Sequence, residues 1–172
     1  MKSRSSATLT RPAALKASHG VSTFDCGRIE IDGWLRERAR KAADNDTART
    51  FVVCRGSKRV VGYHALAAGA VSHLAASGAL RRNSPDPVPV IILARLGVDR
   101  SEQGQGLGQD LLNDAKRRAL QAARIIGARA LVVHALDAEA AKFYEALGFG
   151  RLNAESERTL LVLMRELRDA LP

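Results

Sequence analysis

The sequence has few cysteines and no long apolar run. Only two cysteines occur in 172 residues. Cys26 and Cys54 lie in no CxxC or CxxH spacing, which excludes a disulfide framework and a recognisable zinc site and favours two buried thiols. The longest apolar run, 88–96, is interrupted by Arg95 and is far shorter than the ~18 residues of a membrane span. Residues 1–12 lack an apolar segment, so no secretory signal is expected and the protein is predicted to be soluble and cytoplasmic.

Length and composition predict one folded domain. A chain of 172 residues is close to the usual size of a single domain and can bury a substantial core. Apolar residues make up 46% and charged residues 26%, which is typical of globular proteins and not of disordered ones. We therefore expect a single domain over residues 1–172, with residues 1–8 as a loose N-terminus.

The positive charge is concentrated in the first part of the chain. The net charge is +9, and residues 1–60 hold 13 Lys and Arg against 6 Asp and Glu, whereas residues 101–172 hold 10 of each. Clustered basic residues raise the local potential and release counterions from phosphate backbones. One face is thus expected to contact a polyanion; the alternative is a soluble surface that is merely rich in arginine.

The first half of the chain predicts a helix followed by a hairpin. Apolar residues recur at helical spacing over 29–44, with basic residues between them, which predicts one amphipathic helix. Segments 51–54 and 59–68 are rich in β-forming residues and flank a turn with glycine and serine, so they predict a hairpin. Residues 77–89, with three prolines, are expected to form a loop.

The second half predicts a parallel strand, helix and strand. Residues 90–98 are almost continuously apolar, which indicates a central strand buried on both faces. Gly97 within it indicates either a bulge or a close backbone approach. An amphipathic helix from Leu107 and a strand at 130–136 follow, and this order is typical of parallel pairing.

Capping residues mark the last predicted helix. Asp137 is suited to the N-cap of a helix over 138–147, and Gly148 to its C′ position. The run 160–164 is expected to end the sheet before a short charged tail.

The glycine-rich segment 103–108 predicts an anion site. It lies between a buried strand and a helix, so its backbone N–H groups are placed at a helix N-terminus, where the dipole favours negative charge. The dinucleotide pattern GxGxxG fails because Gln109 stands at its last position, and the Gly-Lys-Ser/Thr ending of a P-loop is absent. A purely structural tight turn is the alternative.

Two motifs resemble one family. The pattern Gln103-x-x-Gly106-x-Gly108 resembles the pyrophosphate signature of the GNAT acetyltransferases, and residues 141–149 are similar to that family's A-x-x-F-Y-x-x-x-G-F segment. The resemblance implies an α/β fold with a mixed sheet of about six to seven strands. The sheet would be splayed between strands four and five and flanked by helices.

A narrower resemblance covers residues 9–165. The segments that carry it are 24–27, 31–35, 61–67, 85–90 and 93–99, and they resemble the GNAT toxins of bacterial toxin–antitoxin modules. The resemblance implies acetylation of the α-amine of aminoacyl-tRNA, which blocks translation, a ribbon-helix-helix antitoxin and a homodimer. Where this branch usually has alanine after Leu96, Gly97 stands here, and we expect a more open bulge.

The resemblance also implies roles for single residues. Tyr144 would protonate the departing CoA thiolate, which is reasonable chemistry for a phenol within hydrogen-bond reach; a core tyrosine is the alternative. The residues that would bind acetyl-CoA are Leu96, Gly97, Val98, Gln103, Gly104, Gln105, Gly106, Leu107, Gly108 and Phe143.

No general base can be assigned from the sequence. An α-amine has a pKa near ~8, so part of it is already neutral at physiological pH and a base is not required. The candidates by position are Asp99, Glu102, His134 and Asp137, and each has a simpler interpretation as a strand-end or capping residue. The remaining histidines have no metal-ligand spacing, so no metal is expected.

The expected tRNA contacts are basic residues that would hold phosphates and carry little sequence information. They are Arg36, Arg40, Lys41, Arg49, Arg81 and Arg82. Trp34 is suited to stacking on a base, although its helical spacing with Leu35 favours a core position. The alternative is an acetyltransferase of a small-molecule or protein amine. A catalytically silent CoA-binding or RNA-binding module would require loss of Tyr144 or of the loop glycines, and both are present.

Overall fold

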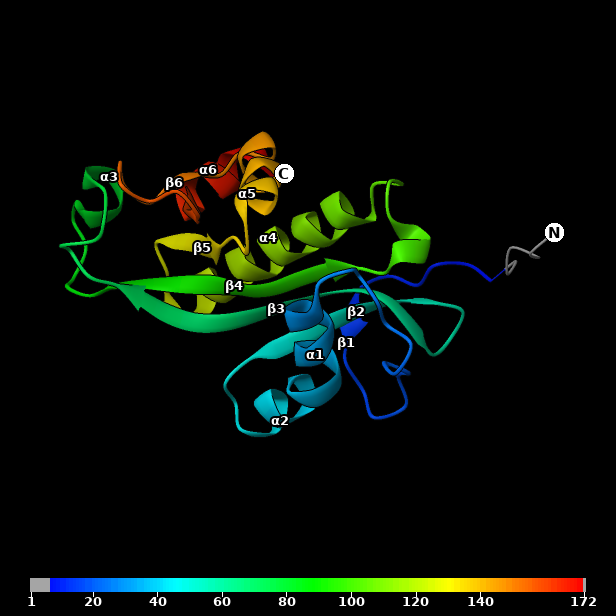
Figure 1. Cartoon of the computed structure of the whole chain (residues 1–172). Coiled ribbons are helices and arrows are strands. Elements are labelled where there is room, and N and C mark those ends of the chain that lie inside the picture. The colour runs from blue at the N-terminus through cyan, green and yellow to red at the C-terminus, as the bar shows by residue number, and fades with distance from the viewer. Residues whose placement is uncertain (1–6, 172) are drawn as a thin grey trace. The chain divides into compact units, whose positions relative to one another are not determined.

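The structure is a computed structural model that describes residues 7–171 (Figure 1). The chain contains both helices and strands. They are β1 (Ala13–Ala14), α1 (Ile29–Glu37), α2 (Ala39–Asp44), β2 (Arg49–Arg55), β3 (Arg59–Val71), α3 (Gly78–Arg81), β4 (Val88–Val98), η1 (Arg100–Glu102), α4 (Leu107–Ile126), β5 (Ala130–His134), α5 (Ala138–Ala146), β6 (Gly150–Arg151), β7 (Thr159–Leu163) and α6 (Met164–Ala170). None of the helices in this described part has the length and apolar character to cross a membrane.

The strands form one mixed sheet in the order β1-β2-β3-β4-β5-β7-β6. β4 and β5 pair in parallel, whereas β1 with β2, β5 with β7, and β6 with β7 pair antiparallel. The register of β4 on β5 covers Ile91, Ile92 and Leu93, and β4 then continues to Val98. The predicted fold class is confirmed, including the parallel pair on either side of α4.

The chain divides into two compact units. The first contains the described residues up to Ala65 together with Arg95–Leu112, and the second contains Leu66–Ala94 and the chain from Asn113 onward. β3 and β4 each contribute residues to both units.

In the first unit, successive residues of β2 pack into two different apolar clusters. Val52 and Cys54 belong to the cluster that includes Phe24 and Leu35, whereas Val53 belongs to the cluster with Leu107 of α4. Side chains alternate between the faces of a strand, so β2 is covered on both faces. Figure 1 shows α1 and α2 beside β2 and β3.

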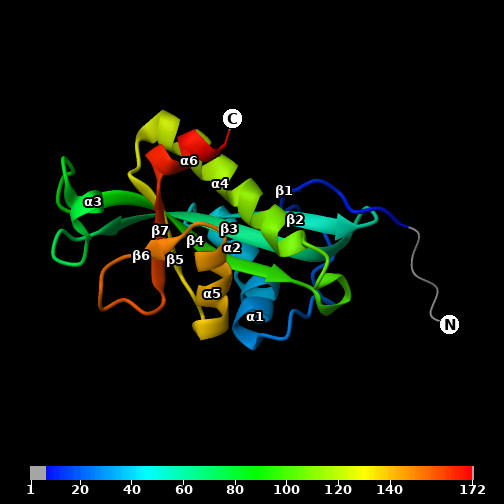
Figure 2. The same ribbon diagram turned by 90° about the horizontal axis from the view of Figure 1, so that it is seen from above.

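The second unit has its own core. Its cluster draws buried residues from β4, β5 and β7 and includes Leu80 of α3 and Leu152. The first four residues of β5 are all buried, which is expected of a strand with neighbours on both edges and cover on both faces. Figure 2 shows β5, β6 and β7 of this unit side by side, as their pairing requires.

Several predicted elements are confirmed, with different bounds. β2 and β3 form the expected hairpin, and β3 runs on to Val71. Asp137 caps α5 by accepting a hydrogen bond from the backbone N–H of Ala140 at 2.9 Å. Gly148 follows the C-cap with a φ of +99°.

Three details differ from the sequence-based expectations. The helix expected over 29–44 is two helices, because the chain leaves helical geometry at Arg38, where φ is −120°. The loop expected over 77–89 contains α3, which is anchored by the fully buried Leu80. The edge strand of the sheet is β6, and β7, the last strand in the sequence, lies between β5 and β6.

The expected charged tail is helix α6. Met164 and Leu167, three residues apart, are both buried, so the tail has an apolar side. The Glu166 carboxylate accepts a hydrogen bond from the backbone N–H of Leu163 at 2.9 Å, which supports the start of the helix.

The predicted loose N-terminus is only partly described. Residues 1–6 lie outside the described residues. The carbonyl oxygens of Ala7 and Thr8 accept hydrogen bonds from the Arg55 guanidinium and the Gly56 N–H. These two residues are therefore held against β2 and are not loose.

Both cysteines are free thiols. Cys54 is buried as predicted, while Cys26 is half-buried. Burial, together with a hydrogen bond to Asp32, raises the pKa of the Cys26 thiol to about 12. The thiolate is therefore scarce at neutral pH, and neither cysteine shows the low pKa of a reactive nucleophile.

Candidate acyl-donor site

The glycine-rich loop is open to solvent at the N-terminus of the longest helix. Gly104 and Gly106 have φ values of +78° and +87°, which residues with a Cβ rarely adopt. Nothing lies within 4 Å of a Cβ built at either position. α4 begins at Leu107 and has 20 residues, so its first N–H groups and its dipole favour an anion there. The open backbone at the start of α4 is compatible with the predicted anion site.

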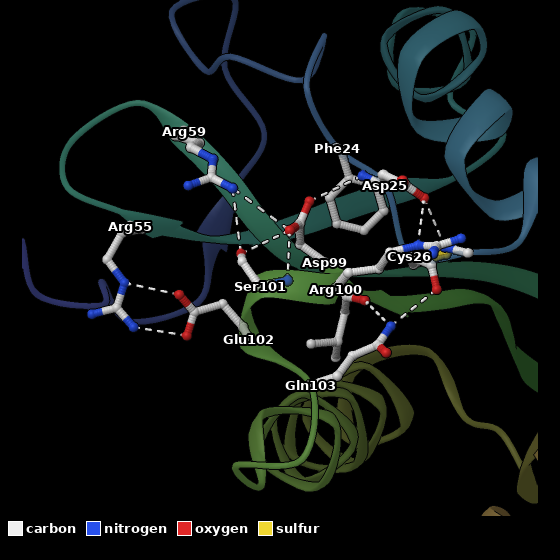
Figure 3. A network of polar contacts seen from close by, with 12 residues as sticks. Phe24, Asp25, Cys26, Arg55, Arg59, Asp99, Arg100, Ser101, Glu102 and Gln103 are labelled. Carbon is white, nitrogen blue, oxygen red and sulfur yellow. Dashed lines mark hydrogen bonds and ion pairs between the residues drawn. The ribbon is translucent and has the colours of Figure 1, made fainter. Parts of the chain in front are cut away.

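The Gln103 side chain holds this loop in place (Figure 3). Its amide nitrogen donates to the carbonyl oxygen of Val98 at 2.9 Å and to that of Cys26 at 3.0 Å. These bonds tie the loop to the end of β4 and to a segment 77 residues earlier in the chain. The first residue of the signature therefore has a positioning role that the motif alone did not reveal.

Asp99 organises the turn between β4 and the loop (Figure 3). Its carboxylate is buried and accepts hydrogen bonds from the backbone N–H groups of Asp25 and Ser101, both at 3.0 Å, and from the Ser101 hydroxyl at 2.7 Å. Burial alone would raise the pKa of Asp99. These hydrogen bonds and the charge of Arg59 outweigh burial and lower the pKa below its ordinary value. The interpretation of Asp99 as a capping residue is confirmed.

We expect Asp99→Asn to lower the free energy of unfolding by about 1–3 kcal/mol at pH 7, because buried N–H donors lose a charged acceptor. The pKa of Asp99 is lower in the folded state than its ordinary value near 3.8. The stabilisation by its carboxylate is therefore complete above about pH 3.8 and is lost as the pH falls through the folded-state pKa. Urea unfolding at pH 7 and pH 3 should show the difference between wild type and variant shrinking in acid. Asp25→Asn, at a more exposed carboxylate, is the control and should show a smaller difference; an equal difference for Asp99→Asn at both pH values would contradict the assignment.

The other candidate bases also have structural partners. Glu102 is 6% exposed and accepts two hydrogen bonds from Arg55, at 3.0 and 2.7 Å. His134 is exposed, and its Nδ1 lies 3.0 Å from the Thr159 hydroxyl. Asp137 caps α5. None of these contacts marks one of the candidates as a general base.

The end of β4 is closely packed at Gly97. A Cβ at this position would lie 2.6 Å from Cγ2 of Ile31, 3.4 Å from the Phe24 ring and 3.5 Å from the Tyr63 ring. Of the two predicted explanations for this glycine, close approach is confirmed. The Ile31 side chain of α1 fills the space where a Cβ at position 97 would lie.

We expect Gly97→Ala to lower the free energy of unfolding by about 1–3 kcal/mol through overpacking against Ile31. Adding Ile31→Ala should recover part of that loss, and a double-mutant cycle by urea unfolding measures the coupling. Gly33→Ala is the matched control, because nothing lies within 4 Å of a Cβ there and α1 favours alanine. Purely additive effects of Gly97→Ala and Ile31→Ala would contradict the packing argument.

Tyr144 lies on α5 in the second unit and is buried, with 7% of its surface exposed. Its ring makes edge contacts with the rings of Phe143, at 5.2 Å, and Phe149, at 5.6 Å. Phe143 itself is half-buried. The three aromatic rings of the A-x-x-F-Y-x-x-x-G-F segment thus fix the orientation of the tyrosine ring.

Lys116 on α4 supports the end of α5. Its ammonium donates to the carbonyl oxygen of Leu147 at 2.7 Å and lies 5.5 Å from the centre of the Phe149 ring. A cation at a helix C-terminus is favourable, although burial lowers the pKa of Lys116. This residue was missed by sequence reasoning, since its partner is 31 residues away and belongs to no shared motif.

The predicted tRNA contacts fall into two groups. Arg36 donates to the carbonyl oxygen of Phe24, Arg40 to those of Lys16 and His19, and Arg49 to that of Ala43. These three guanidinium groups are therefore partly engaged within the first unit. The second group consists of Lys41, Arg81 and Arg82, of which Arg81 donates to the carbonyl oxygen of His73 at 3.5 Å. All six candidates except Arg40 are exposed.

Trp34 is half-buried and packs against the core of the first unit, the position that its spacing favoured. Its ring stacks on Tyr63 with a centroid distance of 6.1 Å and an interplanar angle of 2°. The Arg95 guanidinium lies over the Trp34 ring at 5.5 Å. Within residues 7–171, no cluster of three or more His, Cys, Asp or Glu side chains is arranged to hold a metal ion.

Comparison with known proteins identifies the family. Residues 46–151 match the family described as acetyltransferase (GNAT) domain. A tRNA-acetylating toxin of Mycobacterium tuberculosis (strain ATCC 25618 / H37Rv) is 46% identical over 157 residues, which are 91% of this chain and 93% of the relative.

Two solved structures are similar to this chain over nearly its whole length. AtaT complexed with acetyl-methionyl-tRNAfMet has a TM-score of 0.86 and 29% identity over 96% of this chain and 100% of that one. A tyrosine-to-phenylalanine variant of AtaT bound to acetyl-CoA and the C-terminus of the antitoxin AtaR has a TM-score of 0.81 and 28% identity, covering 94% and 97% of the two chains. The family match spans more than half of the sequence and agrees with the sheet topology and the loop geometry, so this chain belongs to the GNAT acetyltransferase family.

Proposed function

We propose that this chain is a toxin that transfers the acetyl group of acetyl-CoA to the α-amine of an aminoacyl-tRNA and so blocks translation. The observation that carries the proposal is the 46% identity, over 91% of the chain, to a tRNA-acetylating toxin. The complex of AtaT with acetyl-methionyl-tRNAfMet, a neighbour over 96% of the chain, supports it.

The acyl donor is assigned to the first unit. The backbone of residues 103–108 would hold the pyrophosphate, because its two left-handed glycines leave open space and α4 begins there. Main-chain groups of Leu96, Gly97 and Val98 would hold the pantetheine arm. Acetyl-CoA supplies the acyl group and a thiolate leaving group.

Tyr144 is assigned as the general acid. A phenol that donates a proton to the departing sulfur lowers the barrier for thiolate release, and an ordered side chain is required for such a role. The aromatic contacts of Tyr144 supply that order. In the structural neighbour AtaT, a variant with a tyrosine replaced by phenylalanine has been solved with acetyl-CoA.

The attacking amine needs no dedicated base in this proposal. The α-amine of an aminoacyl ester is substantially neutral at physiological pH because α-amino groups have pKa values of about 7.7–8.0. Asp99, Glu102 and Asp137 are already engaged in caps or ion pairs. This supports a mechanism in which the enzyme orients a neutral amine and protonates the leaving group.

The acceptor tRNA would be held by phosphate contacts. Of the six candidates, all but Arg40 are exposed, and Arg36, Arg40 and Arg49 use part of their guanidinium donors on backbone carbonyls. Contacts of this kind weaken steeply with salt, because each releases counterions from the nucleic acid. Binding is therefore expected to lose affinity as ionic strength rises.

The remaining assignments concern partners and organisation. The net charge of +9 suits an acidic segment of an inhibitory partner, and AtaT is bound to its antitoxin AtaR in a neighbouring structure. A ribbon-helix-helix antitoxin, a homodimer and a cytoplasmic location are part of the proposal. So is a single functional domain over residues 1–172, supported by the two strands that both units share.

Transfer of radiolabelled acetyl from acetyl-CoA to charged tRNA, with deacylated tRNA as the control, tests this function. Label on charged tRNA alone supports it. Label on polyamines or peptides, and on no tRNA, would replace it with an acetyltransferase of small-molecule or protein amines. Acetyl-CoA binding without transfer to any amine would indicate a silent module.

A further inference from the structure

An ion pair joins the β2–β3 hairpin to the residue that directly precedes the acyl-donor loop, residues 103–108. Arg55 is the last residue of β2. Its guanidinium donates to both carboxylate oxygens of Glu102, at 3.0 and 2.7 Å (Figure 3). Glu102 ends η1 and is followed at once by Gln103, the first residue of the loop. A contact between residues 47 positions apart therefore holds the chain where it enters the loop.

All three nitrogens of the Arg55 guanidinium have a partner. Nε and Nη2 donate to Glu102, and Nη1 donates to the carbonyl oxygen of Ala7 at 2.7 Å. Only 8% of the Glu102 side chain and 24% of the Arg55 side chain are exposed, so water competes little for these bonds. A bidentate pair also allows fewer relative orientations than a single bond. The pair therefore restricts Glu102 more tightly than an exposed ion pair would.

A second arginine of the hairpin supports the same turn. Arg59, the first residue of β3, donates to the Ser101 hydroxyl at 3.3 Å, and its guanidinium lies 3.6 Å from the Asp99 carboxylate. The Arg59 side chain is 47% exposed, so this ion pair is expected to contribute less. The pair of Arg55 with Glu102 is therefore the contact of the hairpin with the larger expected effect on the loop.

The loop needs such support because little packs against its glycines. Gly104 and Gly106 have positive φ values, and nothing lies within 4 Å of a Cβ built at either position. A glycine backbone loses much conformational entropy when a ligand orders it. A loop that is already held in its binding conformation pays less of this entropy on binding and therefore binds more tightly. At its downstream end the loop continues into α4, and at its upstream end it is held through Glu102 and Gln103.

We propose that Arg55 is a positioning residue of the acyl-donor site. Through Glu102 it holds the backbone of the loop in the conformation that binds the pyrophosphate of acetyl-CoA. Arg55 acts through Glu102 and makes no contact with the donor itself. The inference rests on the proposed function, which assigns the pyrophosphate to this loop. It adds a residue of the β2–β3 hairpin that belongs to neither of the two family motifs.

Two acyl donors and the variant Arg55→Met test the proposal on the full-length protein. Acetyl-CoA is titrated by calorimetry, and S-acetylpantetheine, which lacks the pyrophosphate, is titrated by NMR. The variant should bind acetyl-CoA about tenfold more weakly than wild type. Its affinity for S-acetylpantetheine should stay unchanged, because that donor has no group for the loop to hold. In acetyl transfer the defect should appear in the KM for acetyl-CoA and not in kcat.

Two further variants separate positioning from a general loss of stability. Arg55→Lys keeps the charge but not the bidentate geometry, so it should recover part of the affinity for acetyl-CoA. Arg118→Met is the matched control, because Arg118 pairs with Asp114 at 2.8 Å and their side chains are 31% and 16% exposed. It should leave both affinities unchanged. Amide hydrogen exchange of the loop in the free protein should be faster in Arg55→Met and unchanged in Arg118→Met.

An Arg55→Met protein with the wild-type affinity for acetyl-CoA would overturn the proposal. So would an equal loss of affinity for both donors, or a loss in Arg118→Met as large as that in Arg55→Met. The tRNA acetylation assay is read separately, because the titrations need no acceptor. Failure of the proposed function would appear as wild-type protein that binds acetyl-CoA yet acetylates no charged tRNA, whereas failure of the positioning role would leave acetylation intact in Arg55→Met.

Discussion

Replacing Tyr144 with phenylalanine is expected to lower kcat for acetylation of charged tRNA by about 10²–10⁴-fold, the usual contribution of a general acid. The substitution removes only the hydroxyl. The edge contacts with Phe143 and Phe149 are made by the ring, so the fold and the affinity for acetyl-CoA should change little. Rates from single-turnover acetyl transfer, together with acetyl-CoA binding by calorimetry, separate the chemical step from binding.

Tyr63→Phe is the matched control for this experiment. Tyr63 is also a buried tyrosine, and its hydroxyl donates to the carbonyl oxygen of Ile31 at 2.6 Å. Its removal should cost about 1 kcal/mol of stability and leave the transfer rate close to that of wild type. A Tyr144→Phe enzyme with the wild-type rate would show that Tyr144 is a core residue, and the leaving group would then be protonated by another donor.

Replacing Gly106 with alanine should weaken acetyl-CoA binding by at least about tenfold, or 1.4 kcal/mol. At a φ of +87° a Cβ is strained by about 1–2 kcal/mol. That Cβ would also occupy the open space in which a phosphate approaches the backbone at the start of α4. Calorimetry with acetyl-CoA measures the affinity, and urea unfolding measures the stability.

Gly127→Ala separates strain from ligand contact. Gly127 directly follows α4, has a φ of +79° and, like Gly106, has nothing within 4 Å of a built Cβ. The two variants should therefore lose similar stability, while only Gly106→Ala loses affinity. Equal loss of affinity in both variants would mean that the loop glycine acts through global stability and not through the phosphate site.

The parts of the fold that were predicted correctly depend on contacts between near neighbours in the chain. The cap of α5 joins Asp137 to Ala140, and the glycine at 148 meets a backbone requirement of that same helix. The turn between β2 and β3 likewise needs only its own residues. Such features leave a local signature because both partners fall within one short window of sequence.

The motif predicts the candidate site but does not explain how its loop is held. Glycine spacing predicted the open loop, and its left-handed glycines agree. The bonds that hold the loop, from Gln103 to Cys26 and from Asp25 to Asp99, join residues 77 and 74 positions apart. Hydrogen-bonded pairs so far apart leave no signature in the periodicity or spacing of the sequence. They form only when the strands have assembled.

The sequence by itself determined the family, the mixed sheet and the open glycine loop before α4, because motifs, periodicity, glycine spacing and caps are local properties of the chain. Only the tertiary structure decided that the Ile31 side chain occupies the space where a Cβ at position 97 would lie. It also decided that the Arg40 guanidinium bonds to the carbonyl oxygen of His19 and that Thr50 is buried beside basic residues. These outcomes depend on which side chains compete for the same space and the same hydrogen-bond partners. That competition arises only between segments distant in sequence that packing has brought together.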